Sequence, residues 1–304
     1  MSLDLGVALA GLLVGCTVGL TGMGGGALMT PMLVLFFKID PLAAVSSDIV
    51  ASMVMKPIGG SVHLRRGTVH TGIVKHLVIG SVPSAFVGVL LLSLLGEGAD
   101  LESRLKTLLG AALLVAATAM TAKALLQASR PDTSLAPEEV AVRALPTIAI
   151  GVLGGLIVGL TSVGSGSLMI VLLLVLYPRL RASTLVGTDL VQAVPLVTSA
   201  AIGHLLFGDF QLSLTLSLLV GCIPGVYVGA RVSSRAPGHL IRPVLVTVLV
   251  ASALKLLGVP TAVAAGAGAA LGLMTTAVTV RALRAARARS ADALLAAGDL
   301  ATER

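Results

Sequence analysis

The chain has 304 residues, of which 56% are apolar and only 12% are charged, and its mean hydropathy is +1.03. A soluble domain of this size carries roughly twice that share of charged residues, so soluble domains are excluded and a single polytopic membrane domain is predicted. The net charge of +7 would suggest nucleic acid in a soluble protein. Here the basic residues fall in short loops and the C-terminal tail, which indicates membrane topology, and no nucleic-acid partner is expected.

Apolar runs predict membrane helices along most of the chain. They cover residues 3–21, 24–37, 42–63, 72–95, 105–127, 143–161, 164–178, 184–206, 210–230, 241–257 and 260–280. The runs 24–37 and 164–178 are shorter than the roughly 20 residues that a full crossing needs, and each follows a Gly-rich interruption. We predict broken or re-entrant helices there, and run length does not decide whether they span fully or re-enter.

The parts of the chain on either side of a polar stretch at 128–142 are copies of each other. Residues 19–29 match residues 159–169 at an offset of 140. Later blocks hold an offset of 141, so that Asp48 aligns with Asp189 and His63 with His204. Several matching blocks in nearly constant register indicate an internal duplication.

Charges around the duplicated blocks predict that the two copies have opposite orientations. Arg65 and Arg66 lie two and three residues after His63, whereas no basic residue closely follows its counterpart His204. At the start of the same helices the situation is reversed, and only the second copy is preceded by a basic loop, with Arg179 and Arg181. Positive charge accumulates on the cytoplasmic side. The copies therefore form an inverted-topology repeat, the architecture of many secondary transporters.

These patterns predict an all-α polytopic membrane protein of two inverted-topology repeats of transmembrane helices with Gly-rich broken or re-entrant helices. The first repeat covers residues 1–127 and the second covers 143–257, with a cytoplasmic linker at 128–142 between them. Residues 258–280 are expected to form an additional transmembrane helix, and residues 281–304 a basic cytoplasmic tail.

The two Gly-rich interruptions occupy equivalent places and form the predicted anion site. In inverted-repeat transporters the substrate lies near the membrane midplane, where interrupted helices present free backbone N–H groups. Each interruption precedes a short helix whose positive end could face an anion, although close helix packing through small residues is the alternative. The predicted substrate-binding residues are the glycines and hydroxyls of the interruptions and one lysine: Thr21, Gly22, Gly24, Gly25, Gly26, Lys56, Thr161, Gly164, Ser165, Gly166 and Ser167.

Ionisable side chains inside the membrane are further candidates, because a charge at the bilayer centre costs at least about 3 kcal/mol. Asp48, Lys56 and His63 fall on one helix face, and Lys56 has no counterpart in the second copy. We interpret Lys56 as a counter-charge for an anion, with a structural ion pair to Asp48 as the alternative. The acids either couple transport to protons or cap the amides of the neighbouring break, and the histidines are expected to be interfacial rather than proton relays. The coupling or structural polar candidates are Ser47, Asp48, Ser52, His63, Asp189, Gln192 and His204.

No nucleophile with an adjacent base, no metal-ligand cluster and no phosphate loop appears elsewhere in the sequence. We therefore predict no enzyme activity, no metal and no cofactor. Cys16 and Cys222 lie inside apolar runs and are expected to be core residues.

At these motifs the sequence resembles the sulfite exporter TauE/SafE family of membrane transporter proteins, also grouped as the 4-toluene sulfonate uptake permeases. The resemblance rests on residues 19–26, 46–48 and 63–69 and on the Gly-x-x-Pro helix, and covers roughly residues 5–257. It implies movement of sulfur-containing anions such as sulfite, sulfoacetate or other organosulfonates across the bacterial plasma membrane.

The predicted function is an inner-membrane permease that moves a small anion, sulfite or an organosulfonate by this resemblance, through alternating access. An anion channel and a non-transporting membrane scaffold are the alternatives. The expected partners are a small sulfur-containing anion and the lipid bilayer, and a homodimer is left open. The expected location is the bacterial plasma membrane, with multiple passes and a cytoplasmic C-terminus.

Overall fold

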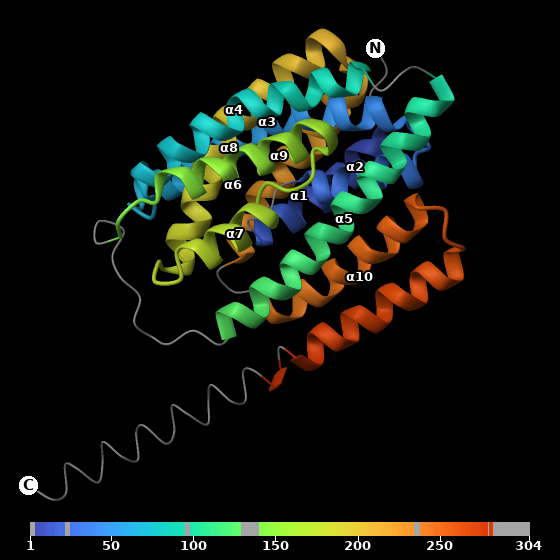
Figure 1. The fold of residues 1–304 in the computed structure, drawn as a ribbon. Helices are drawn as coiled ribbons and strands as arrows, with labels where there is room; N and C mark the ends of the chain where they lie inside the picture. The colour runs from blue at the N-terminus through green and yellow to red at the C-terminus, as the bar shows by residue number, and fades with distance from the viewer. Residues whose placement is uncertain are drawn as a thin grey trace, which may run out of the picture.

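The computed structural model describes residues 4–21, 25–94, 98–128, 140–233, 238–278 and 280–281. Within these ranges the structure contains helices and no strand (Figure 1). In chain order they are α1 (Leu5–Thr21), α2 (Gly26–Leu35), α3 (Pro41–Arg65), α4 (Thr71–Leu94), α5 (Gly98–Ala128), α6 (Ala144–Thr161), α7 (Leu168–Leu176), α8 (Ala182–Phe207), α9 (Leu212–Ser233), α10 (Gly238–Leu256) and a last helix, Thr261–Val278. The all-α fold class is therefore confirmed.

Seven helices of the described part are long and apolar enough to cross a membrane. Their outward faces are apolar as well: the leucines Leu94 and Leu145 are 79% and 80% exposed. Surfaces of this kind are stable against lipid and unfavourable in water. The chain is a multi-pass membrane protein.

The third helix begins at signals that the sequence carries locally. The Asp40 carboxylate caps α3 by accepting hydrogen bonds from the backbone N–H groups of Leu42 at 2.8 Å and Ala43 at 3.4 Å. Pro41 follows at the first helical position, where its missing N–H removes no hydrogen bond. After the helix, Gly67 adopts a φ of +65°, which glycine tolerates without a steric penalty.

The short helices α2 and α7 each return toward the end of the bundle at which the preceding long helix begins. A Cβ atom on Gly6, near the start of α1, would lie 3.3 Å from the ring of Phe37, just beyond α2. In the second copy, the Arg143 backbone N–H donates to the Tyr177 hydroxyl at 3.0 Å, which joins the start of α6 to the end of α7. Both short segments therefore re-enter rather than span, an alternative that run length left undecided.

Helices of one copy pack on helices of the other, in equivalent pairs. The pair α1 with α9 and the pair α4 with α6 exchange roles under the duplication. A Cβ on Gly80 of α4 would collide with the Ile148 carbonyl oxygen of α6, and a Cβ on its counterpart Gly221 of α9 would collide with the Ala8 carbonyl oxygen of α1. Only glycine permits these approaches, as is common where membrane helices pack closely.

The equivalent helices α3 and α8 lie against each other and run antiparallel. Ser46 lies near the start of α3 and hydrogen-bonds to His204 near the end of α8, with the oxygen 2.9 Å from Nδ1. At the other end of α3, His63 lies against Gly187, near the start of α8, where a Cβ would be 3.0 Å from the imidazole. Antiparallel equivalent helices are compatible with the inverted repeat that the charge pattern predicts.

Helices α5, α10 and Thr261–Val278 lie next to one another along one side of the bundle (Figure 1). A Cβ on Gly110 of α5 would lie 3.1 Å from the Ala253 carbonyl oxygen of α10. A Cβ on Gly268 of the last helix would lie 2.7 Å from the Thr247 carbonyl oxygen. The last helix thus packs on α10, outside the duplicated part.

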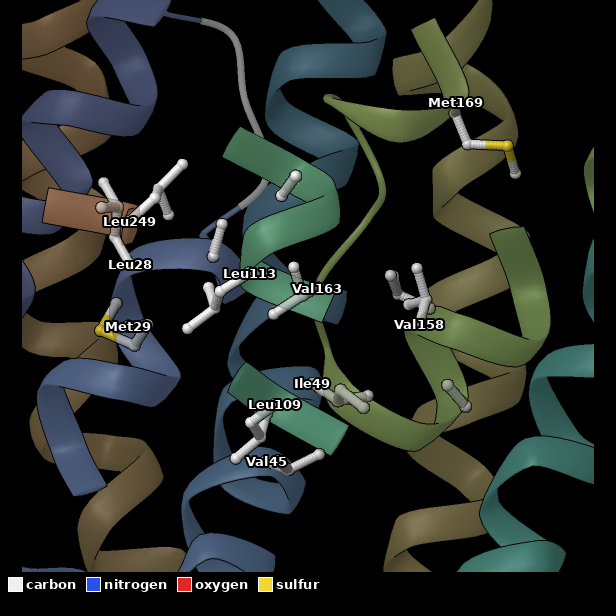
Figure 2. Packing of buried hydrophobic residues seen from close by; sticks show 14 of the residues in the cluster. Leu28, Met29, Val45, Ile49, Leu109, Leu113, Val158, Val163, Met169 and Leu249 are labelled. Atoms are coloured by element: carbon white, nitrogen blue, oxygen red, sulfur yellow. The ribbon is translucent and has the colours of Figure 1, made fainter. Parts of the chain in front are cut away.

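A single apolar cluster holds these layers together around the middle of the bundle. Figure 2 shows part of it, with Leu28 of α2, Ile49 of α3, Leu113 of α5 and Val163 of the α6–α7 connection in one neighbourhood. Val163 is fully buried. The second interruption is therefore enclosed by apolar packing, which makes each polar group left inside it energetically significant.

Candidate functional site

The second interruption, between α6 and α7, is an irregular segment buried in the bundle. Helix α6 ends at Thr161, after which Ser162, Gly164 and Gly166 have φ values of +59°, +122° and +96°. The Thr161 hydroxyl donates to the Ile157 carbonyl oxygen at 2.6 Å and accepts from the Val163 N–H at 3.2 Å. Irregular backbone at membrane depth is tolerated only where protein or a cavity surrounds it.

Four hydroxyl groups of this interruption are withdrawn from solvent. They belong to Thr161, Ser162, Ser165 and Ser167, which are 3 to 7% exposed. Buried hydroxyls of this density are unusual in an apolar bundle unless they serve a polar partner. They line the N-terminal end of α7, where backbone N–H groups lack helical acceptors.

The first interruption touches the second directly. Gly25 and Gly26 begin α2, and a Cβ on Gly26 would collide with the Ser162 backbone carbonyl and hydroxyl oxygens. The two predicted half-sites therefore form one place in the structure. Of the other predicted residues of this break, Gly22, Gly24 and the Thr21 side chain lie outside the described part of the chain.

Asp48 of α3 is fully buried beside both interruptions. Its Oδ2 accepts hydrogen bonds from the Thr30 hydroxyl of α2 at 2.9 Å and from the Ser162 hydroxyl at 2.8 Å. Its Oδ1 has no hydrogen-bond partner among the described residues and faces Gly25, where a Cβ would lie 3.8 Å away. One carboxylate oxygen thus remains available to a partner at the first break.

Lys56, also on α3, joins the first copy to the break of the second. Its ammonium donates to the Ser165 hydroxyl at 2.6 Å, and the side chain is only 8% exposed. Among the side chains that the structure describes, no carboxylate lies within 4.0 Å of it, so the alternative of a direct ion pair with Asp48 is wrong. The charges of Asp48 and Asp189 still act on Lys56 over a longer distance.

Asp189 of α8 has different partners from its counterpart Asp48. It accepts from the Gln192 amide at 3.2 Å and from the Gly166 backbone N–H of the second break. Gln192 in turn accepts from the Ser81 hydroxyl of α4 at 3.3 Å. The contact with Gly166 is compatible with the capping role that the sequence suggested for the acids, which stays a prediction.

The two histidines differ in their surroundings. His204 is fully buried, and its Nε2 donates to the Gly159 carbonyl oxygen at 2.9 Å while Nδ1 faces the Ser46 hydroxyl. Contacts with α3 and α6 bury the side chain of His204, whereas its place at the membrane interface stays a prediction. His63 is half-buried, with Nδ1 2.9 Å from the Thr68 hydroxyl.

The remaining polar candidates of α3 are buried on the same helix as Asp48. Ser47 is fully buried and its hydroxyl accepts from the Gln211 N–H at 3.4 Å, while Ser52 is 3% exposed. Neither contacts the two interruptions through a recorded hydrogen bond. We regard Ser47 as a structural group.

Three residues of the site escape the sequence-based prediction: Thr30, Ser162 and Lys123. Thr30 aligns with Ile170 and Ser162 aligns with Gly22, so both are polar in one copy only. That difference was a usable signal, since a hydroxyl facing a buried acid has no apolar substitute. Lys123 of α5 is half-buried and acts electrostatically on Asp189, but nothing local in the sequence indicates its nearness.

The assembled site offers several hydrogen-bond donors and one cation to a small anion, beside the buried carboxylates of Asp48 and Asp189. The N-terminal end of α2 lies against the second interruption, which leads into α7, and helix N-termini attract negative charge. Lys56 adds a buried positive charge, and the serine hydroxyls can donate to oxyanion oxygens. Within the described residues, no group of three or more His, Cys, Asp or Glu side chains could hold a metal ion.

Comparison with known proteins identifies the family of the chain. Residues 7–256 match the family described as "Sulfite exporter TauE/SafE". The chain is 39% identical over 258 residues to "Probable membrane transporter protein YjnA" of Bacillus subtilis (strain 168), a match that covers 84% of this chain and all of that protein. It is 26% identical over 233 residues to "Probable membrane transporter protein YdhB" of the same organism, covering 76% of this chain and 90% of that protein.

No solved structure matches the chain. The family match nevertheless spans both copies, and the two relatives named are described as probable membrane transporter proteins. The chain belongs to the sulfite exporter TauE/SafE family.

Proposed function

We propose that the protein is a plasma-membrane permease that binds a small anion, sulfite or an organosulfonate, between its two helix interruptions and moves it by alternating access. The description of the family supports the substrate class. The geometry of the interruptions supports the binding place. No step of covalent chemistry is involved.

The observation that carries this proposal is the hydrogen bond between Lys56 and Ser165. A buried cation of the first copy reaches 2.6 Å to a hydroxyl in the broken helix of the second. A charge is expensive at membrane depth and usually serves a ligand or a pathway. An oxyanion entering beside Ser165 would gain both the ammonium and the hydroxyl as donors.

Alternating access is supported by how the two copies meet. Helices α3 and α8 are antiparallel equivalents, and the α1–α9 and α4–α6 pairs are exchanged by the duplication. In transporters of inverted-repeat design, one repeat moves against the other around a fixed central site. The site here lies at such a contact, because Asp48 and Lys56 of one copy bond to Ser162 and Ser165 of the other.

The orientation proposed from charge places the α3–α4 connection and the end of α7 in the cytoplasm, with the C-terminal tail on the same side. Arg65, Arg66, Arg179 and Arg181 lie at that end of the bundle. The starts of α1, α3 and α5 lie at the other, extracytoplasmic end. Both re-entrant hairpins then approach the central site from opposite membrane faces.

Thermal stabilisation of the detergent-purified protein tests the proposed binding, because a ligand that binds only the folded state raises Tm. The panel is sulfite, sulfate, thiosulfate, sulfoacetate, taurine and simple carboxylates. We expect a selective, saturable rise in Tm with a sulfur oxyanion or sulfonate. Lys56→Met should abolish the rise, whereas Lys75→Gln, an exposed lysine near the start of α4, should retain it.

Two results would contradict the proposal in different ways. A rise with carboxylates alone would remove the sulfur anion as substrate, and an undiminished rise in Lys56→Met would remove the site. Uptake of labelled anion into reconstituted vesicles distinguishes a carrier from a channel. Unlabelled anion on the far side of the membrane should accelerate uptake through a carrier, and no acceleration would favour a channel.

A further inference from the structure

A second cluster of positive charge lies away from the central site, around a hollow of about 560 Å³. We call it the outer hollow. It lies where the end of α2, the start of α5 and the end of α10 meet, and its charged lining residues are Lys38, Asp40, Glu102, Lys106 and Lys255. The proposed topology places this end of the bundle outside the cell.

The charges of the outer hollow do not cancel locally. Lys106 is paired with Glu102 at 2.5 Å, and the Asp40 carboxylate is used in capping α3. Lys38 and Lys255 are both exposed and have no recorded ion pair among the described residues. Lys38 and Lys255 therefore have no ion-pair partner there, and the three lysines of the lining exceed its two carboxylates by one positive charge, which attracts an anion.

This concentration of lysine is out of keeping with the rest of the chain. Three of the six lysines of the sequence line this one hollow. Basic residues are expected mainly on the cytoplasmic face, so a lysine cluster at the opposite end departs from the topology pattern. Lys38 also has a φ of +57°, a left-handed conformation that side chains other than glycine, asparagine and aspartate rarely adopt.

The outer hollow is connected to the central site by α2. This helix of 10 residues begins at the first interruption and ends beside Lys38, a length of about 15 Å. The walls between the lysines include the apolar side chains of Val34, Leu35 and Leu256. Cations above an apolar wall suit an oxyanion that carries an organic group.

We propose that the outer hollow is a second, extracytoplasmic anion-binding site that holds the sulfonate or sulfur oxyanion carried by the central site. This inference rests on the proposed function for the identity of the anion, but its test does not require transport. Lys38 and Lys255 bind the charged group and raise the local anion concentration at the outer end of α2. The apolar wall contacts the remainder of the ligand.

The absence of Trp from the sequence provides a direct test. A single Trp introduced as Leu35→Trp would line the hollow. If that variant does not fold, Leu257→Trp is the second reporter, because Leu257 is 39% exposed and lies between two residues that line the hollow. Quenching of its fluorescence by iodide reports the local anion concentration, and quenching by neutral acrylamide reports access alone. Methanesulfonate serves as the competing probe.

We expect each of Lys38→Gln and Lys255→Gln to lower the iodide quenching constant about twofold, with acrylamide quenching unchanged. Methanesulfonate should protect the reporter from iodide. The control variants Lys75→Gln, at the opposite end of the bundle, and Lys56→Met, in the central site, should change neither result.

An iodide quenching constant that neither Lys38→Gln nor Lys255→Gln changes would overturn the proposal. Protection that disappears in Lys56→Met would also overturn it, because the effect would then come from the central site, and the proposed function would stand. Protection by phosphatidylglycerol vesicles but not by methanesulfonate would assign the hollow to a lipid headgroup instead.

Discussion

Asp48 and Asp189 occupy equivalent positions in the two copies, yet they are held in different ways. Asp48 accepts two side-chain hydroxyls through one oxygen and leaves the other oxygen without a partner. Asp189 accepts an amide and a backbone N–H. The backbone frame is repeated, whereas the polar lining is not.

The unmatched positions explain this difference. Thr30 aligns with the apolar Ile170, Gln192 aligns with Ala51, and Lys56 aligns with Val197. Each of these changes falls on the polar groups around the interruptions. The comparison indicates that the duplication built two similar breaks, and that later divergence made a single asymmetric site from them.

The largest expected effect concerns the contact between the breaks. Gly26→Ala should lower the free energy of unfolding by about 3 kcal/mol, because its Cβ would collide with the Ser162 backbone. Gly25→Ala is the matched control, since its Cβ would have its nearest neighbour at 3.6 Å, an ordinary contact. Tm of the two purified variants checks this; equal values would contradict a direct contact between the breaks.

The second prediction compares the histidines. His204→Leu should cost about 2 kcal/mol, because it leaves the Gly159 carbonyl and the Ser46 hydroxyl buried without a partner. The equivalent change His63→Leu should cost well under that amount, since His63 is half-buried and bonds within its own turn region. Chemical or thermal unfolding of both variants measures the difference. A larger loss of unfolding free energy in His63→Leu than in His204→Leu would contradict this prediction.

The third prediction concerns the acids themselves. Asp189→Asn should lower stability by about 1 to 2 kcal/mol, because the new amide cannot accept from both Gln192 and Gly166. Asp48→Asn should cost less, since the oxygen replaced by the amide nitrogen has no partner to lose. Paired Tm measurements test the order of the two effects, and the opposite order would show that Asp48 is the better satisfied group.

The smallest expected effect is at Thr30. Thr30→Val keeps the shape but removes one donor to Asp48, at a cost of about 1 kcal/mol. In a second variant that also carries Ser162→Ala, the loss should exceed the sum of the single losses, because Asp48 would then have no recorded donor. Simple additivity in this double-mutant cycle would indicate that the two hydroxyls act independently.

Much of the fold follows from sequence patterns because they are periodic and long. Apolar runs and the duplication predict the all-helical architecture, and the equivalence of the two breaks predicts where the polar site lies. Re-entry of α2 and α7 does not follow, because a run of this length is compatible with either path. It is decided by tertiary contacts at Phe37 and Tyr177.

The details of the site depend on neighbours that are distant along the chain. Lys56 is recognisable as an intramembrane charge, but its partner Ser165 lies 109 residues away. His204 is a similar case. The sequence indicates where His204 lies along its helix, but it does not indicate which other helices cover the side chain. At Thr30 and Ser162 the useful signal is a difference between the copies, because each polar residue is aligned with an apolar residue or a glycine in the other copy.

The most direct measurement of the central claim is uptake of a labelled sulfur anion into vesicles that contain the wild-type protein, Lys56→Met or Lys75→Gln. If Lys56 and Ser165 form the anion site, Lys56→Met should lose at least about tenfold in uptake, as expected for removing a buried charged donor, while its Tm stays near that of the wild type. Lys75→Gln should transport normally. Uptake by folded Lys56→Met at the wild-type rate would contradict the account.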